Sequence, residues 1–395
     1  MSPTPIEDQA RGTGRLRLMN TRHVLWALRH VGRPARIVEL TELTSLTRPT
    51  VAQIIAALEG RGWLQRYEPI GAAGRPAVRY GIAPSTFAVF GADAGGHRAV
   101  VEIASLDGET QARRERWHEQ PLGERMLDLL GTMVHECLDE LGLPPTAVVT
   151  GTVASPGIVE PRSGQITLRS SLGRWNGAQV ATALSGHIGG AVAVDNDANL
   201  AARAMCTVDD VPQTFLGLQW GQRIGAGIVL NGQVYRGRTG AAGELGSLLL
   251  PDPVTGEIRQ LEEVVPASRL PLLGGAPDVS TEELIARAEA GDDRSAEALR
   301  RGVDPLAAAI APICVGLDLH TVTISGAIAR SGPALIAAFV ERLAAHGAVD
   351  VDCRLSPFLE DTVLRGAVGD AVDAGWEWLL EESGSQEPAS ANQPS

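Results

Sequence analysis

Two groups of side chains in this sequence are suited to recognising a ligand. The first group lies in one short segment and consists of Thr47, Arg48, Thr50 and Gln53. Arginine reads guanine with two hydrogen bonds, glutamine reads adenine in the same way, and a threonine hydroxyl bonds a phosphate or a base edge. Presented from the start of one helix, these residue types predict contacts in the major groove of DNA.

The second group consists of Asn196, Asp197 and Glu244, which follow a strand or a glycine-rich turn. A carboxylate accepts hydrogen bonds from two hydroxyl groups, and an amide both donates and accepts. A pocket holding all three side chains would suit a polyol. Each motif also has an ordinary interpretation, because Asn-Asp after a strand is often a helix cap and Gly-Glu is often part of a turn.

A helix must present the first group. Apolar residues recur at i, i+3, i+4 and i+7 over Val51, Ile54, Ile55 and Leu58, which puts Thr50 and Gln53 on the outer face. Thr47 is a good N-cap and Pro49 fits the first turn, so the helix begins there. Gly60 and Gly62 end it. Helical spacing over 24–31 and a short apolar pattern over 37–40 predict two preceding helices.

A β-hairpin follows these helices. Residues 63–67 and 78–82 are predicted to form two strands. In the second, Val78, Tyr80 and Ile82 alternate with Arg79 and Gly81, which puts Arg79 on the polar face. The predicted tip, 71–76, holds Arg75, a cation suited to a narrow minor groove. Three helices and a basic hairpin predict a winged helix-turn-helix DNA-binding domain over residues 15–84.

The charge distribution supports DNA as the partner. Residues 1–90 hold 12 Arg and 6 acidic residues, a net charge of 12 − 6 = +6, and residues 91–395 hold 22 Arg and 41 acidic residues, which gives 22 − 41 = −19. A basic head on an acidic body is typical of one DNA-binding domain joined to a partner that does not bind DNA. The alternative is that the winged helix of this chain binds a protein instead of DNA.

Composition indicates a cytoplasmic protein. The 395 residues contain no apolar run long enough for a membrane helix and no apolar core of a signal peptide near the start. Cys137, Cys206, Cys314 and Cys353 form no CxxC pair, which predicts reduced thiols. We expect a flexible tail over 1–14 and a disordered tail over 382–395.

The body, from about residue 87 to 380, carries an ordered series of motifs between predicted strands and helices. They are Asp93-Ala94-Gly95-Gly96, Pro156-Gly157, Asn196-Asp197, the glycine-rich loop 221–227, Gly243-Glu244-Leu245-Gly246, and Ser325-Gly326-Ala327. In order and spacing they resemble the ROK family of bacterial repressors, open reading frames and sugar kinases. With the winged helix in front, the chain is similar to its NagC/XylR-like regulators.

The resemblance implies an α/β protein whose residues 85–381 form a two-lobed, actin-like ATPase fold. The small lobe would comprise about 85–195 plus 366–381, and the large lobe about 196–365. The resemblance makes Asn196 and Glu244 sugar ligands and Asp197 the counterpart of the catalytic base. Gly157 would lie on the other side of the sugar, and the loops after Asp93 and Gly221 would bind phosphate.

Several positions depart from the family pattern. His97 replaces a threonine in the first phosphate loop, and the second reads Gly221-Gln222-Arg223-Ile224-Gly225, without its hydroxyl. A kinase needs a phosphate grip, so we expect no kinase activity, no catalytic residues and no cofactor, although Arg223 could hold a phosphate. Ser247 stands where many members have a histidine, and residues 248–263 hold no Cys or His, so we expect no structural zinc.

The sequence thus predicts a transcriptional regulator, a repressor by family resemblance, that binds an operator in double-stranded DNA and senses a small carbohydrate. We expect a homodimer or homotetramer without membrane association. Two alternatives remain: a sugar kinase with a fused DNA-binding head, and a regulator that has lost its effector. Trp175, Trp220, Trp376 and Trp378 could stack on a sugar, but are expected in the core or an interface.

Overall fold

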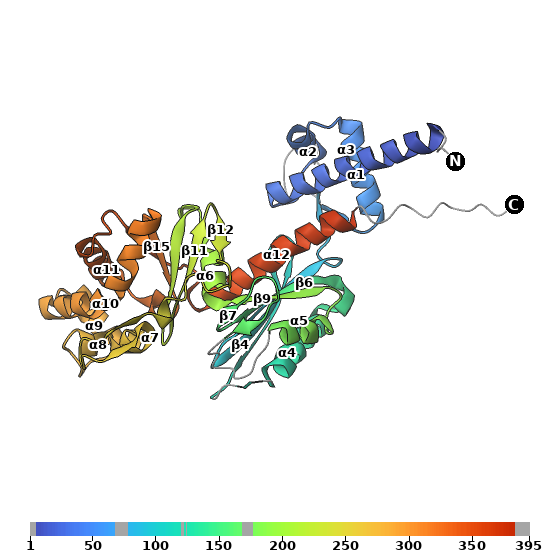
Figure 1. Ribbon diagram of the computed structural model, residues 1–395. Coiled ribbons are helices and arrows are strands. Elements are labelled where there is room, and N and C mark those ends of the chain that lie inside the picture. The colour runs from blue at the N-terminus through green and yellow to red at the C-terminus, as the bar shows by residue number, and fades with distance from the viewer. Residues whose placement is uncertain (1–4, 68–77, 120–121, 124, 168–176, 384–395) are drawn as a thin grey trace.

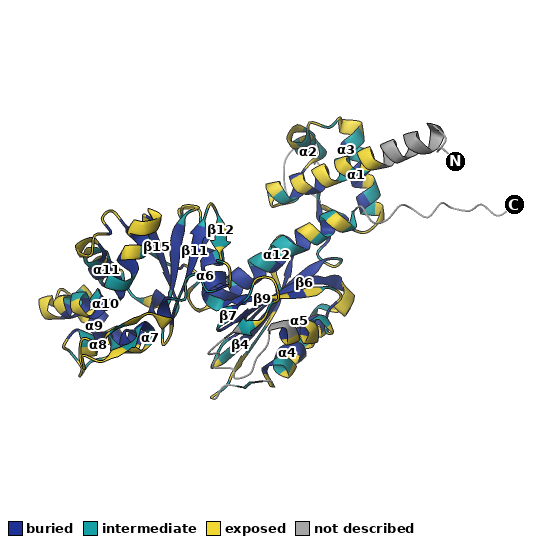
Figure 2. Cartoon of the chain, viewed as in Figure 1, coloured by how far each residue is buried: buried dark blue, intermediate teal, exposed yellow. Residues whose placement is uncertain are grey.

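The computed structural model describes residues 5–67, 78–119, 122–123, 125–167 and 177–383. It shows a small N-terminal head above a body of two lobes (Figure 1). The strands of both lobes are largely buried, while the outer helices expose one face (Figure 2). No helix in the described ranges is long and apolar enough to cross a membrane.

The head has the predicted three helices and hairpin. Its elements are α1 (Pro5–Val31), α2 (Ile37–Thr44), α3 (Arg48–Gly60), β1 (Leu64–Tyr67) and β2 (Arg79–Ile82), the two strands being antiparallel. The apolar positions of the helices form its core, which contains Val24, Leu25, Leu28, Leu40, Val51, Ile54, Ile55 and Leu58. The predicted hairpin tip, with Arg75, lies outside the described residues.

The predicted tail over 1–14 is wrong for residues 5–14, because α1 begins at Pro5. Proline suits the first turn of a helix, where its missing N–H needs no partner. Gly12 and Gly14 lower helix propensity by about 1 kcal/mol each, yet they do not interrupt α1. Local propensity is a weak guide where a helix continues from a well-packed segment. Of the predicted C-terminal tail, residues 384–395 lie outside the described residues.

The small lobe is built on a five-stranded sheet of order β5-β4-β3-β6-β9. Its strands are β3 (Ala88–Ala94), β4 (Arg98–Ser105), β5 (Thr110–Trp117), β6 (Val148–Ser155) and β9 (Ala191–Asn196), accompanied by α4 (Arg125–Leu141), α5 (Gly177–Ser185) and the small hairpin β7 (Ile158–Val159) and β8 (Ile166–Thr167). The first three strands are antiparallel neighbours, and β6 and β9 run parallel to β3.

The large lobe repeats this topology in a sheet of order β12-β11-β10-β15-β16. The strands are β10 (Phe215–Trp220), β11 (Ile224–Leu230), β12 (Gln233–Tyr235), β15 (Thr321–Ser325) and β16 (Asp352–Leu355). Again three antiparallel strands are followed by two parallel ones. A helical layer and a hairpin complete the large lobe. The layer consists of α7 (Leu261–Val264), α8 (Leu270–Leu273), α9 (Thr281–Glu289), α10 (Asp293–Leu317) and α11 (Pro333–Ala345), and the hairpin of β13 (Leu249–Pro251) and β14 (Ile258–Gln260). The repeated sheet confirms the two-lobed α/β prediction.

Two helices connect the lobes and the head. Helix α6 (Asp197–Met205) follows β9, and α12 (Thr362–Glu382) packs on α6 and on the small-lobe sheet, then extends toward the head (Figure 1). A Cβ atom on Gly366 would lie 1.8 Å from the Leu200 carbonyl oxygen, so only glycine allows the two helices to approach this closely. Movement of α6 must therefore disturb α12.

The cores of the head and the small lobe are continuous. Trp63 of the head packs edge-on against Phe87, with ring centroids 5.4 Å apart, and Phe87 packs against Trp378 of α12 at 5.7 Å. Trp376 is buried and donates to the Leu106 carbonyl at 2.8 Å, and Trp220 is buried in the large lobe, as expected of core residues. Trp378 is half-buried in this junction, and Trp175 lies outside the described residues.

Candidate functional site

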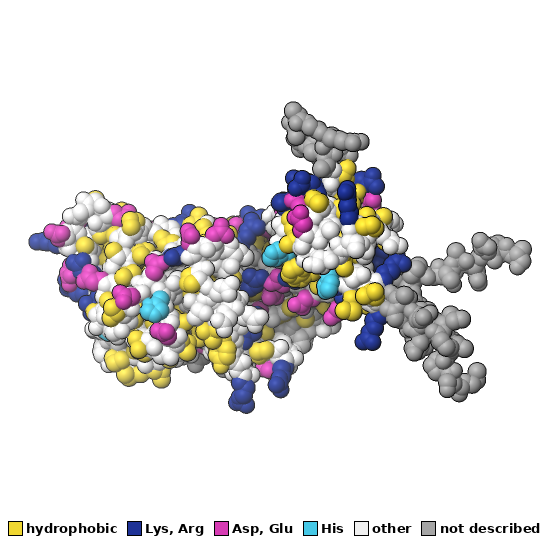
Figure 3. Space-filling model, turned by 90° about the horizontal axis from the view of Figure 1, so that it is seen from above, with side chains coloured by type: hydrophobic (Ala, Val, Ile, Leu, Met, Phe, Trp, Pro, Cys, Tyr) yellow, Lys and Arg dark blue, Asp and Glu magenta, His cyan; other side chains and the backbone are white. Residues whose placement is uncertain are grey.

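The start of α3 presents the predicted DNA-reading group to solvent. Thr47 caps the helix, its hydroxyl oxygen lying 3.4 Å from the Thr50 amide nitrogen and 2.8 Å from the Thr50 hydroxyl. Arg48 and Gln53 are exposed and make no hydrogen bond or ion pair with the described part of the chain. Arginine side chains are distributed over the surface of the head (Figure 3).

Arg79 has a different environment. It is half-buried, and its guanidinium donates to the Pro34 carbonyl at 3.3 Å, which ties the hairpin to the segment between α1 and α2. Its contact with DNA stays a prediction, as does that of Arg75, which lies outside the described residues.

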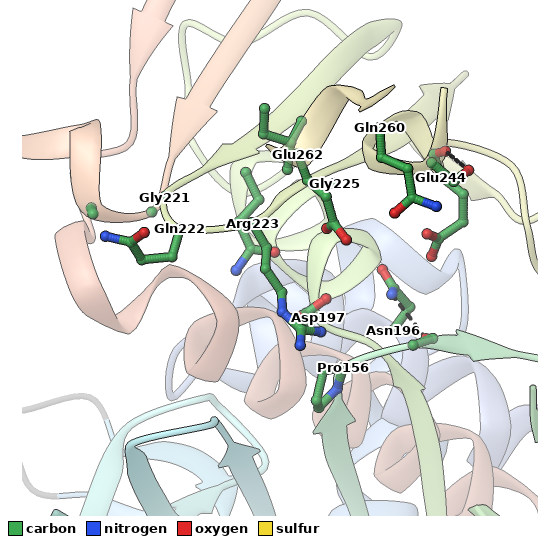
Figure 4. Close-up of a pocket in the computed structure, with 16 residues that line it drawn as sticks. Pro156, Asn196, Asp197, Gly221, Gln222, Arg223, Gly225, Glu244, Gln260 and Glu262 are labelled. Atoms are coloured by element: carbon green, nitrogen blue, oxygen red, sulfur yellow. Dashed lines mark hydrogen bonds between the residues drawn. The ribbon is translucent and has the colours of Figure 1, made fainter. Parts of the chain in front are cut away.

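A cavity of about 310 Å³ lies where β9 of the small lobe meets the loops of the large lobe. All four predicted effector-binding residues, Gly157, Asn196, Asp197 and Glu244, line this cavity. Figure 4 shows Asn196, Asp197 and Glu244 around it. The volume falls at the lower end of the range of small-molecule pockets, which is about 300–1,000 Å³.

Asn196 is held in place by its role as the N-cap of α6. Its side-chain oxygen accepts a hydrogen bond from the Asn199 amide at 3.1 Å, and its Nδ2 donates to the Gly157 carbonyl at 3.0 Å. Asn196 is therefore a helix cap, as the ordinary interpretation of Asn-Asp predicted. This role does not exclude ligand binding by Asn196, since an amide has further donor and acceptor capacity.

The neighbouring Asp195 fixes this corner of the cavity. It is buried and pairs with Arg236 at 2.6 Å, and its other oxygen accepts from the Asn196 amide at 2.8 Å. A buried carboxylate must be paired to be tolerated, so Asp195 is a structural anchor.

Carboxylates outnumber cationic groups in the lining of the cavity. Burial is the main reason why the pKa of Asp197 is raised to about 6, against a lowering by the Ala198 amide and Arg223. Burial and the charges of Asp197 and Glu262 likewise raise the pKa of Glu244. Three acidic groups and one arginine line the cavity, so a neutral ligand rich in hydroxyl groups fits it better than an anion does.

Glu244 lies across the cavity from Asn196 (Figure 4) because its turn packs tightly against β11. Gly243 has a φ of 88°, and a Cβ atom there would lie 1.8 Å from the Ala226 carbonyl oxygen. Only glycine meets both requirements, which explains the Gly243-Glu244 pair.

The loop after β10 uses its own polar groups. The Gly221 amide donates to the Arg223 carbonyl at 3.0 Å, and the Gly221 carbonyl accepts from the Ala267 amide at 2.8 Å. An amide that closes its own turn is not available to a phosphate oxygen. This geometry agrees with the degenerate sequence of the loop.

The first phosphate loop joins β3 to β4 and does not line the cavity among the described residues. Burial, with a contribution from Asp197, raises the pKa of Asp93 to about 7. The remaining cavity wall includes Gln219, Gln260 and Glu262, which the sequence did not suggest, and Ser247, which stands where many family members have a histidine. Gln260 and Glu262 had no distinguishing signal, since they lie in an ordinary capping segment that reaches the cavity only through the fold of β14.

No group of three or more His, Cys, Asp or Glu side chains in the described ranges is placed to hold a metal ion. In the hairpin of β13 and β14, where the family resemblance would put zinc ligands, Asp252 is buried and pairs with Arg269 at 3.0 Å. All four cysteines are free thiols, and three of them are buried.

Both halves of the molecule now have a defined class: a helix-turn-helix head and a duplicated α/β body with a polar cavity between its lobes. The model of the ROK family matches residues 89–371, and the model of the IclR helix-turn-helix domain matches residues 18–68. The chain therefore belongs to the ROK family and carries a helix-turn-helix domain.

Similar proteins include both kinases and repressors. A beta-glucoside kinase of Listeria innocua is 29% identical over 243 residues, 58% of this chain and 81% of the kinase. A xylose repressor of Caldicellulosiruptor bescii is 23% identical over 214 residues, 53% of each protein.

Among solved structures, a ROK family transcriptional regulator described as a homologue of the Escherichia coli MLC protein superposes with a TM-score of 0.71. It is 19% identical and covers 93% of this chain and 99% of that one. A ROK family glucokinase from Streptomyces griseus, solved with glucose and AMPPNP, has a TM-score of 0.59, 18% identity and coverage of 72% and 99%. These structures support the fold.

Proposed function

We propose that this protein is a transcriptional regulator that binds an operator through α3 and senses a neutral, sugar-like ligand in the cavity between the lobes. The observation that carries the proposal is the acidic cavity at the N-terminus of α6, a helix that is linked to the head. We further propose that the protein represses transcription, in line with the name of the xylose repressor relative. A cytoplasmic location and a symmetric oligomer complete the proposal.

The link to the head starts at the cavity. Asn196 caps the first turn of α6, and Arg203 near its other end forms an ion pair with Asp373 of α12. The second oxygen of Asp373 pairs with Arg29 of α1 at 2.6 Å. A ligand that shifts α6 would therefore act on the ion pairs that hold the head, and it regulates DNA binding if it prefers one arrangement.

A second contact holds α1 to the same helix. Arg22 donates to the Leu380 carbonyl of α12 at 3.0 Å. Together with the continuous aromatic core at Trp63, Phe87 and Trp378, these bonds fix the head on α12. A ligand-driven shift would change the placement of two α3 helices in an oligomer, and DNA half-sites tolerate little change in spacing.

DNA binding is tested with the Arg48→Ala and Gln53→Ala variants on operator fragments selected from genomic DNA. Loss of a base contact costs about 1–3 kcal/mol, or roughly 5- to 150-fold in affinity, and relaxes specificity at one position. Arg300→Ala, in the large lobe, is the control for net charge. Operator affinity and specificity that stay unchanged in both head variants would refute docking through α3.

Sugar binding is tested by thermal shift and calorimetry over a broad panel of sugars and sugar derivatives. We expect stabilisation by at least one neutral sugar and its loss in Glu244→Gln. If no sugar in the panel stabilises the protein, the result would favour the alternative that this regulator has lost its effector.

A sugar kinase is the second candidate, and one observation favours it. Beside the first cavity, sharing Gln222 and Ala327, lies a second cavity of about 470 Å³ lined in part by Ser268, Thr281, Glu289 and Arg330. A nucleotide there could direct its phosphates past Gln222 and Ala327 into the first cavity, which Asp197 lines. Phosphoryl transfer from ATP to a sugar that disappears in Asp197→Ala would establish this activity, and we expect none.

A further inference from the structure

Helix α1 has two apolar faces, and the head uses only one of them. Val24, Leu25, Ala27 and Leu28 are buried in the head core. On the opposite side, Leu16, Met19 and Trp26 are exposed by 59%, 53% and 49%. A helix that covers one core needs one apolar stripe, and the head core leaves the second stripe exposed.

The exposed residues follow the pattern of a coiled coil. Together with the exposed His23 and His30 they stand at positions 16, 19, 23, 26 and 30, alternating steps of three and four. This is the spacing of a and d positions, whose side chains face a neighbouring helix. The rings of Trp26 and His30 stack, with centroids 5.2 Å apart and an interplanar angle of 12°, which holds the indole on the outer face.

The surface beside this stripe is acidic. A groove of about 550 Å³ between α1 and α12 is lined by Arg22, His23, Trp26, Glu377, Leu380 and Glu381. In Figure 3, hydrophobic and histidine side chains lie next to acidic ones where the head meets the body. Residues 15–31 of α1 contain arginine and histidine but no acidic residue. Glu377 and Glu381 on the α12 side of the groove are therefore complementary in charge to the basic α1 of a second copy that lies along the stripe.

We propose that α1 pairs with α1 of a second copy of this chain through the stripe Leu16, Met19, His23, Trp26 and His30, beside the groove bounded by Glu377 and Glu381. The pairing is isologous, since the same stripe contributes from both copies. It brings two α3 helices into one particle, as a two-fold symmetric operator requires. The proposal does not depend on ligand sensing by the body.

Cross-linking tests the pairing directly. His23 occupies the centre of the stripe, so two-fold pairing puts it near its counterpart in either helix direction. In a Cys206→Ser background, which removes the partly buried thiol, we expect His23→Cys to form a disulfide-linked dimer under mild oxidation. Arg17→Cys, exposed on the same helix but off the stripe, is the matched control and should remain mostly monomeric on a non-reducing gel. Equal cross-linking of the two variants, or none in His23→Cys, would overturn the proposal.

Mass measurement provides the second test. Trp26→Glu puts a charge in the seam without touching the head core, so the variant should keep its melting temperature and raise the dimer dissociation constant by more than about tenfold. Trp117→Glu, at a tryptophan with 69% exposure in the small lobe, is the control and should leave the dimer intact. Light scattering after gel filtration measures both. A Trp26→Glu variant with the dimer affinity of the parent protein, or a parent that is monomeric at tens of micromolar, would refute the pairing.

Discussion

Replacing Asp373 by asparagine should uncouple the body from the head. Asp373 is the one residue that contacts both Arg203 of α6 and Arg29 of α1 through ion pairs in the described structure. Asparagine keeps the size of the side chain and loses its charge, so both pairs weaken together. The packing of α12 on α6, fixed by Gly366, stays unchanged.

The size of the effect follows from exposure. The side chains of Arg29, Asp373 and Arg203 are 34%, 40% and 21% exposed, so solvent screens both pairs. Such pairs contribute about 0.2–1 kcal/mol each. Losing both then removes about 0.4–2 kcal/mol of coupling free energy, which corresponds to a factor of about 2–30 in affinity.

The assay compares operator affinity, by fluorescence anisotropy, with and without a saturating concentration of the sugar that gives the largest thermal shift. The ratio of the two affinities should fall by that factor in Asp373→Asn, while sugar affinity in the absence of DNA changes little. Hydrogen exchange of the α1 amides should accelerate even without a ligand. Asp304→Asn is the matched control, because Asp304 also bridges two partners, Arg342 and His346, but lies within the large lobe.

If Asp373→Asn keeps the parent ratio of operator affinities, these ion pairs do not couple the body to the head. A double-mutant cycle with Arg29→Ala sharpens the test, since residues in one network give non-additive effects. Strict additivity of Arg29→Ala and Asp373→Asn would show that this ion pair carries no coupling.

Three further predictions concern stability. Asn196→Ala removes the cap of α6 and should cost about 1 kcal/mol in urea unfolding, whereas Asn196→Asp keeps a capping oxygen and should cost less. Burial raises the folded-state pKa of Asp197 from 3.8 to about 6, so the contribution of Asp197 to stability falls as pH rises through that window. Asp197→Asn should therefore stabilise the protein more at pH 8 than at pH 4. A difference in melting temperature that stays constant between the two pH values would contradict this. Asp252→Ala leaves Arg269 without its buried partner and should cost about 3–5 kcal/mol, while a metal chelator should leave the melting temperature unchanged.

Much of the head could be predicted because its signals are local. The spacing of Val51, Ile54, Ile55 and Leu58 predicted the buried face of α3, and Thr47 predicted its first residue, since a cap and a helical period depend only on nearby residues. Asp107-Gly108 and Asn231-Gly232 are dipeptides typical of tight turns, and in the structure they connect the antiparallel strands β4 and β5 and β11 and β12.

The start of α1 could not be predicted in this way. Gly12, Gly14 and a polar composition favoured a tail, and helix propensity alone is a weak signal when a longer helix is already formed. Arg79 is a related case, because its alternation predicted an outward side chain, while its contact with the Pro34 carbonyl depends on how the hairpin packs on the head.

The candidate site was predictable only in part. Asn196, Asp197, Glu244 and Gly157 were found from motifs, and the structure places all four around one cavity. Glu262 and Gln260 were missed, because nothing in their own segment distinguishes them from a surface helix start. Their position opposite Asp197 depends on the path of the large-lobe hairpin (Figure 4).

The sequence by itself determined the helix and turn pattern of the head, the contrast between a basic head and an acidic body, and the order of the motifs in the two lobes. These properties depend on residues close together in the chain or on simple counts. Only the tertiary structure decided which carboxylates share a cavity and raise one another's pKa, that Asp373 joins α6 to α1, and that α1 leaves a second apolar face exposed. Electrostatic and packing effects depend on distances between groups far apart in the sequence, and folding sets those distances.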